Sequence, residues 1–170
     1  MTHSISRLEA FSDGVIAIII TLLVFNLPVP PPDEGDLWQG LLSRWAEFVA
    51  FFVSFFVIGV MWINHHDLFR LIEKGDHILF VLNIFLLLGM TITPFTTRLM
   101  AAYLQSDDNQ VAGVIYATGG LITALGFNLL WRYASYKCRL ISKTASEADI
   151  QKITRNYNIG FALYFIAFLV

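Results

Sequence analysis

Long apolar stretches constrain the fold of this 170-residue chain more than any other feature. A helix needs about 20 predominantly apolar residues to cross the hydrocarbon core of a bilayer. Four such stretches are expected at residues 8–27, 45–63, 77–98 and 110–133, and a fifth begins near Asn156. Because the fifth stretch reaches Val170 before it is long enough to cross, the chain is expected to be truncated or to lack a last helix. The sequence therefore predicts an all-α, polytopic membrane helix bundle, with residues 1–170 in a single transmembrane domain.

Composition and the intervening segments support this class. Only 14% of the residues are charged, whereas soluble domains carry about 25%. The first apolar run is followed by PVPPPDEGD instead of a small-residue cleavage site, so it is interpreted as a retained helix and not a signal peptide. Residues 141–153 are predicted to form a short amphipathic cytoplasmic helix or loop, and Pro94 is expected to kink the third span.

The distribution of basic residues predicts the orientation. Short loops that face the cytoplasm carry an excess of Lys and Arg. Nine basic residues fall on the side of the N-terminus and two on the other side: Arg7, Arg70, Lys74, Arg132, Lys137, Arg139, Lys143, Lys152 and Arg155 against Arg44 and Arg98. We therefore expect a cytoplasmic N-terminus, with the single cysteine, Cys138, on the same reducing side.

The first span has an apolar stripe and a carboxylate that lies off it. At about 100° per residue, one stripe contains Arg7, Phe11, Gly14, Ile18, Leu22 and Phe25. Ser12 and Asp13 lie away from this stripe, where a charged group in a membrane needs partners from other helices. The expected partners are Arg7, Ser12, Trp62, Asn64, His65 and His66. Two interpretations stay open: this polar group only fixes helix packing, or it holds the first helix in a chosen tilt around a pathway.

Periodicity by itself favours a packing role for the stripe over a pore-lining role, since apolar residues spaced four and three apart usually face lipid or another helix. Nothing in the chain matches the TVGYG carbonyl filter, and ATGGLI (117–122) is interpreted as a packing face. Adjacent histidines project about 100° apart on a helix, so His65 and His66 are poor ligands for one metal. Six further polar residues of the spans are expected to form interhelical hydrogen bonds: Asn83, Thr91, Thr93, Thr96, Thr97 and Asn128.

Arg7, Phe11, Ser12 and Asp13 form an RxxxFSD motif at the start of the first span. With MWINHH closing the second span, this motif resembles the transmembrane protein 175 family of endolysosomal potassium channels, in particular its single-repeat prokaryotic members. The resemblance implies six helices per repeat and a homotetramer in which the first helix of each subunit lines a central pore. It also implies a plasma-membrane channel of a prokaryotic cell that passes K⁺ and other monovalent cations, without a cofactor, enzymatic activity or nucleic-acid partner.

The resemblance also implies roles for individual residues. The narrowest, apolar ring is expected at Ile18, with further rings at Leu22 and Phe25 and with Thr21 close by. Phe25 is bulkier than the leucine expected at its position. A network that controls gating is expected from the motif and the end of the second span: Arg7, Phe11, Ser12, Asp13, Trp62, Asn64, His65 and His66.

An apolar ring of this kind closes by dewetting when narrow, and when wider it favours K⁺ because K⁺ holds its water more loosely than Na⁺. A proton-coupled secondary transporter is the alternative, with Asp13 and His65 or His66 as the titrating groups. A third possibility is a structural or enzyme-associated membrane subunit that passes no ions by itself.

Overall fold

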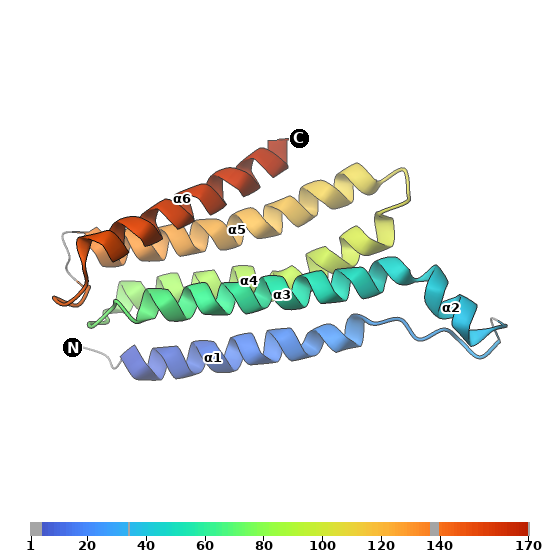
Figure 1. Cartoon of the computed structure of the whole chain (residues 1–170), viewed down its shortest axis with the longest axis horizontal. Coiled ribbons are helices and arrows are strands. Elements are labelled where there is room, and N and C mark those ends of the chain that lie inside the picture. Colours follow the sequence, from blue (N-terminus) through green and yellow to red (C-terminus); the bar gives the residue numbers. More distant parts are fainter. Residues whose placement is uncertain (1–4, 34, 137–139, 170) are drawn as a thin grey trace.

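The computed structural model describes residues 5–33, 35–136 and 140–169. Their elements follow one another as α1 (Ile5–Leu22), the 3₁₀ helix η1 (Leu23–Asn26), α2 (Leu37–Ser43), α3 (Trp45–Phe69), α4 (His77–Tyr103), α5 (Asn109–Ser135) and α6 (Glu147–Leu169). No β-strand occurs among these residues; a single isolated bridge joins Ile72 to Ile141. The long helices lie roughly side by side, with α1 at one edge of the bundle and α6 at the opposite edge (Figure 1). The predicted all-α class is confirmed.

Four helical segments are long and apolar enough to cross a membrane: Ile5–Asn26, Trp45–Phe69, His77–Tyr103 and Asn109–Ser135. These are the first four predicted spans, and the second is longer because α3 continues through the NHHD sequence to Phe69. The fifth predicted span lies within α6, which begins at Glu147 and not near Asn156; its first turns are strongly polar, and it is not among the four candidates found in the described residues. For the same reason residues 147–153 are part of α6 and not a separate amphipathic element. The chain is a multi-pass membrane protein.

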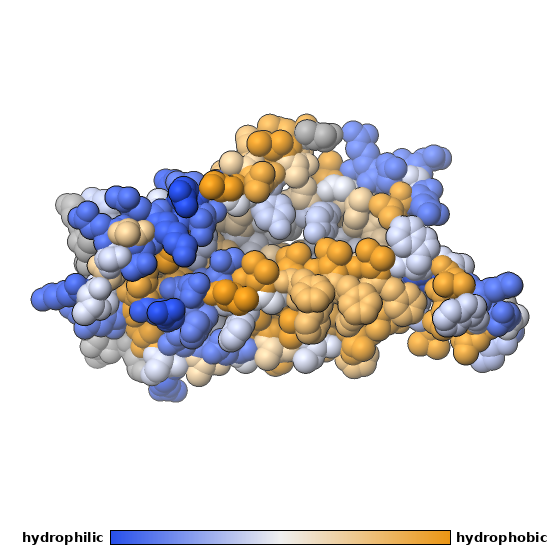
Figure 2. Space-filling view, viewed as in Figure 1, coloured by the Kyte–Doolittle hydropathy of each residue, from blue (hydrophilic) through white to orange (hydrophobic). Residues whose placement is uncertain are grey.

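The described ends of the helices separate by charge. The start of α1, the end of α3, the start of α4, the end of α5 and the start of α6 lie at one end of the bundle (Figure 1). This end carries most of the basic residues, and Figure 2 shows polar side chains gathered at it beside an apolar middle section. His3, Glu34, Lys137, Cys138 and Arg139 lie outside the described residues.

Asp76 organises the turn between α3 and α4 at this basic end. Its carboxylate caps α4 by accepting a hydrogen bond from the Leu79 amide at 2.9 Å, as N-cap aspartates do. The same carboxylate accepts a 2.6 Å hydrogen bond from the Tyr133 hydroxyl of α5. The loops beside it pair through the Ser142 amide, which donates to the Leu71 carbonyl at 2.8 Å. The basic end is therefore held together by polar contacts outside the apolar spans.

Small residues let α4 and α5 approach closely, as is common between membrane helices. A Cβ atom added to Gly126 would lie 2.9 Å from the Cα atom of Leu86, and one added to Gly89 would lie 3.0 Å from the Cα atom of Thr123. Gly119, in the predicted packing face at 117–122, meets Thr96 at a similar distance. The outer part of α4, which follows Pro94, turns away from the axis of its first part (Figure 1).

The short helix α2 has no counterpart among the predicted elements. Its N-cap is Asp36, whose carboxylate accepts from the Trp38 amide at 3.1 Å. Gly40 packs on Pro30, where an added Cβ atom would come within 2.9 Å of the proline ring. At seven residues, α2 is too short to show helical periodicity in the sequence.

Candidate functional site

The helix α1 presents two different faces. One face packs into the bundle through Leu8, Ser12, Ile16, Ile19 and, in η1, Leu23, all of which are buried. These residues recur at spacings of four, four, three and four, which places them on one side of a helix. They contact α3 and α4, the two helices packed against α1. The buried face therefore fixes how α1 lies against α3 and α4.

The predicted stripe occupies another face, and it is exposed. The exposed fractions are 59% for Ile18, 50% for Leu22 and 79% for Phe25. Arg7, Phe11 and Gly14 are exposed as well. Phe25 lies in η1, and because a 3₁₀ helix has three residues per turn, it lies more directly above Leu22 than an α-helix would place it. Among the described residues, no helix buries this stripe.

Thr21 lies beside the stripe and is also exposed. Its hydroxyl group lies 2.9 Å from the Ala17 carbonyl and 3.0 Å from the Ile18 carbonyl. The proton of this hydroxyl is therefore used inside the helix, and its oxygen presents lone pairs to whatever faces α1.

Asp13 is held by Trp62. The indole Nε1–H of Trp62 donates a 2.9 Å hydrogen bond to Asp13 Oδ1 across the contact between α1 and α3. The His66 ring stacks on the indole with ring centroids 6.0 Å apart. A charge-assisted bond of this kind is stronger than one between neutral groups. Asp13 thus has an interhelical partner and lies off the exposed stripe.

A second set of bonds runs from α1 to α3 through Asn83 of α4. His65 Nε2 lies 2.9 Å from Asn83 Oδ1, and Asn83 Nδ2 donates to Ser12 Oγ at 2.9 Å. Ser12 Oγ in turn donates to the Leu8 carbonyl at 2.9 Å. Because the Asn83 oxygen can only accept, His65 must carry its proton on Nε2. All three side chains are buried, so this chain of bonds joins three helices inside the membrane section.

Apart from its bond to Asn83, the His65 ring has apolar surroundings in Phe69. The ring stacks on Phe69 at a centroid distance of 4.4 Å. Its Nδ1 atom is buried and has no hydrogen-bond partner among the described residues. Buried polar atoms usually find a partner, so His65 is satisfied on one side only.

The expected network divides into two groups and leaves some members apart. Ser12 and His65 meet through Asn83, while Asp13, Trp62 and His66 form the other group. Arg7 makes no hydrogen bond or ion pair with the described residues, and Phe11 is exposed. The backbone carbonyl of Asn64, and not its side chain, accepts a 3.1 Å bond from the Tyr157 hydroxyl.

Asn83 was expected to form an interhelical hydrogen bond, and it does, but the sequence did not assign it to the site. The signal that could have found it is its position as the only amide within the run HILFVLNIFLLLGM of the third span. Within the described parts of the chain, no group of three or more His, Cys, Asp or Glu residues could hold a metal ion.

The family comparison decides where the chain belongs. Residues 7–94, which contain α1, the polar groups just described and Pro94, match the family model described as endosomal/lysosomal potassium channel TMEM175. The chain belongs to the TMEM175 family. Residues 7–94 also hold every side chain of the candidate site.

Relatives of TMEM175 type match most of the chain. It is 43% identical over 165 residues to a protein of Chamaesiphon minutus named a potassium channel, covering 95% of this chain and 81% of that protein. The crystal structure titled a lysosomal potassium-selective channel TMEM175 homologue from Chamaesiphon minutus superposes with a TM-score of 0.87 at 40% identity, covering 97% of this chain and 85% of that one. A Gallus gallus protein named endosomal/lysosomal proton channel TMEM175 is 33% identical over 117 residues, which are 64% of this chain and 23% of that protein.

Proposed function

We propose that this TMEM175-family chain forms a K⁺-permeable channel, with α1 from each of four copies lining a central pore. The observation that carries this proposal is the exposed stripe of Ile18, Leu22 and Phe25 on a helix whose other face is buried. Repeating one apolar face around a symmetry axis buries it without a further protein, as closed homo-oligomers do. The names of the bacterial relatives support K⁺ as the permeant ion.

The pore so formed selects by dehydration instead of by coordination. Rings of Ile18, Leu22 and Phe25 carry no oxygen atoms, and a narrow apolar ring closes by dewetting. A slightly wider ring passes ions that can shed part of their water, which K⁺ does more readily than Na⁺. Thr21 offers the hydroxyl oxygen nearest to these rings, and only its lone pairs are free for a passing cation.

The polar groups behind the stripe act as anchors in this proposal. The Trp62–Asp13 bond and the chain through Asn83 attach the first turns of α1 to α3 and α4. They fix the tilt of α1, and hence the width of the rings, without entering the pathway. Ser12, Asn83 and His65 are buried between helices, whereas Asp13 and Trp62 are exposed and satisfy each other through their hydrogen bond.

The surroundings follow from the same proposal. The N-terminus lies in the cytoplasm of a prokaryotic cell, and the chain resides in its plasma membrane. Its partners are monovalent cations, lipid and three further copies of itself. It has neither a cofactor nor a catalytic role.

The proton-coupled transporter is disfavoured by the way its titrating groups are used. Asp13 is bonded to Trp62, and His65 is enclosed between Asn83 and Phe69. None of these groups lies on the exposed stripe. The relatives reported above carry channel names.

Substituting Ile18 tests the pore directly. In liposomes that contain the purified protein, Ile18→Asn should raise K⁺ and Na⁺ flux and reduce the preference for K⁺, because an amide hydrates the constriction. Ile84→Asn is a matched control, since Ile84 is 58% exposed on α4 and Ile18 is 59% exposed on α1. Liposomes with the Ile84→Asn variant should show the same K⁺ and Na⁺ fluxes as liposomes with the parent protein.

Equal K⁺ and Na⁺ fluxes from parent, Ile18→Asn and Ile84→Asn proteins would contradict the pore assignment. Saturable K⁺ uptake that requires a proton gradient, and that Asp13→Asn abolishes, would support the transporter in its place.

A further inference from the structure

Ser54 of α3 has a hydroxyl group that departs from the pattern of its neighbours. Other hydroxyls on these helices bond to the carbonyl four residues earlier: Ser12, Thr21, Thr91, Thr97, Thr118, Thr123 and Thr154. Ser54 is 1% exposed, and its Oγ atom has no hydrogen-bond partner among the described residues. Leaving a buried hydroxyl without a partner is unfavourable, so the site should contain a group that the protein does not provide.

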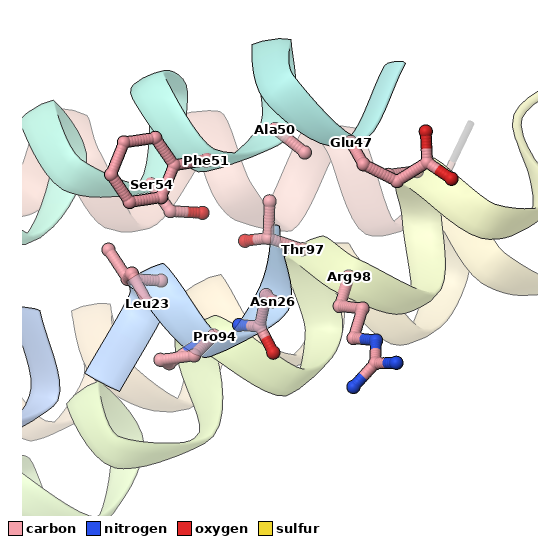
Figure 3. A pocket seen from close by; sticks show the side chains of 10 residues that line it. Leu23, Asn26, Glu47, Ala50, Phe51, Ser54, Pro94, Thr97 and Arg98 are labelled. Atoms are coloured by element: carbon pink, nitrogen blue, oxygen red, sulfur yellow. The ribbon is translucent and has the colours of Figure 1, made fainter. Parts of the chain in front are cut away.

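The Ser54 side chain lines a small cavity between η1, α3 and α4. Its volume is about 10 Å³, and its walls include Leu23, Asn26, Phe51, Pro94 and Thr97. Figure 3 shows the hydroxyl groups of Ser54 and Thr97 pointing toward one another across it, with the Asn26 amide nitrogen on the same side. A cavity of this volume, with two or more polar partners, holds one water molecule.

We propose that one ordered water molecule occupies this cavity and ties the outer end of α1 to α3 and α4. The water accepts hydrogen bonds from Ser54 Oγ and from the Asn26 amide, and it donates one to Thr97 Oγ1. Thr97 Oγ1 is free to accept because its own proton goes to the Thr93 carbonyl at 2.9 Å. Pro94, in the cavity wall, has no N–H for the Met90 carbonyl, and ordered water commonly accompanies such interruptions in membrane helices.

A monovalent cation fits this cavity less well than water. The two charged residues of its walls, Arg98 and Glu47, have opposite signs, and their charged groups point away from Ser54 and Thr97 (Figure 3), so no carboxylate faces a cation there. Three polar side chains are also enough for a water molecule, which typically makes about three hydrogen bonds when buried.

The position of the water gives it a structural role. At its basic end α1 is joined to α3 and α4 through Ser12, Asn83 and His65. At its other end the bound water joins Asn26, the last residue of η1, to the same two helices. The role of this tie in conduction rests on the proposed function, whereas the water site itself does not.

Radiolytic labelling with ¹⁸O-water of the protein in nanodiscs tests the site, because ordered water promotes oxidation of adjacent side chains. Phe51 and Pro94 should incorporate ¹⁸O in the parent protein, and Ser54→Val, which fills the cavity and removes the donor, should largely abolish it. Thr118→Val is the matched control, since Thr118 bonds only within α5, and it should leave labelling at Phe51 and Pro94 unchanged.

Hydrogen exchange measures separately whether the bound water stabilises the outer end of α1. Loss of about one hydrogen bond's worth of stability should make the amides of residues 23–27 exchange about fivefold faster in Ser54→Ala. A density map that shows water within hydrogen-bond distance of Ser54 and Thr97 would support the proposal. Unlabelled Phe51 in the parent, unchanged exchange in Ser54→Ala, or density that is K⁺-dependent would overturn it. Absent K⁺ flux would refute the proposed function and leave the water site standing.

Discussion

At the scale of single residues, Asn83 of α4 links α1 to α3. Its side chain bonds to partners on both α1 and α3, with its oxygen toward His65 and its nitrogen toward Ser12. An amide is suited to this position because it donates and accepts at once. Replacing it removes a partner from two buried groups, and lipid cannot supply another.

We expect Asn83→Leu to lower the free energy of unfolding by about 2 kcal/mol, because His65 and Ser12 both lose a bond. The measurement is thermal unfolding in detergent, followed by the loss of the folded peak in size-exclusion chromatography. Thr91→Val is the control on the same helix, since the Thr91 hydroxyl bonds only to the Leu87 carbonyl. If both variants unfold at the same temperature, Asn83 does not hold the helices together.

Sequence reasoning reached some of these residues and not others, for physical reasons. Asp13 stood out because a carboxylate in an apolar run is costly, and Trp62 was among its expected donors. That Trp62, and not Arg7, donates to Asp13 depends on how α1 and α3 lie against each other. The periodicity of a single helix carries no information about that arrangement. Ser54 looks like an ordinary serine in the sequence, and its lack of a partner appears only once η1 and α4 are placed around it.

At the scale of elements, the contact between α4 and α5 is set by glycines at which the backbones nearly touch. A methyl group on Gly126 would meet the Leu86 backbone at 2.9 Å, and backbone atoms cannot move aside as a side chain can. Gly113, on the same helix, has nothing within 4 Å of the equivalent position. Alanine substitutions at the two glycines therefore distinguish the effect of helix packing from the intrinsic helix preference of alanine over glycine.

Gly126→Ala should lower the free energy of unfolding by about 1–3 kcal/mol, as overpacking does. Gly113→Ala should be neutral or stabilising by up to about 1 kcal/mol, since alanine favours the helix. Chemical unfolding in mixed micelles, monitored by circular dichroism, measures both. Equal effects of the two substitutions would mean that the close approach of α4 and α5 contributes little.

The boundaries of the elements were the weaker part of the prediction. The four spans followed from length and hydropathy alone, because each backbone group in lipid must be bonded within its own helix. The extension of α3 through NHHD and the early start of α6 were missed because polar residues can continue a helix once it leaves the membrane. The 3₁₀ turn at Leu23–Asn26 has no counterpart in hydropathy, although it decides where Phe25 lies.

At the scale of the whole molecule, the distribution of charge is asymmetric along the bundle. Seven basic residues of the described segments lie at the end where α1 starts, counting the nine in the sequence without Lys137 and Arg139. Arg44 and Arg98 lie toward the other end, which also carries Asp107 and Asp108. This asymmetry predicts how the bundle is inserted.

Single-cysteine labelling of intact cells measures the insertion. In a Cys138→Ala background, Asp107→Cys should react with a membrane-impermeant maleimide added outside, and Lys74→Cys should react only after the cells are permeabilised. Both positions are exposed in the protomer, so access to the reagent and not burial decides the result. The reverse pattern would place the N-terminus outside.

The two faces of α1 are also subject to different constraints on their side chains. Leu8, Ser12 and Ile16 are buried against the rest of the chain, whereas Ile18, Leu22 and Phe25 are at least half exposed. A lineage can therefore exchange one bulky apolar residue for another along the second row while the protomer keeps its architecture. Phe25, which is bulkier than the leucine expected there, is 79% exposed, so its size is not limited by packing within the chain.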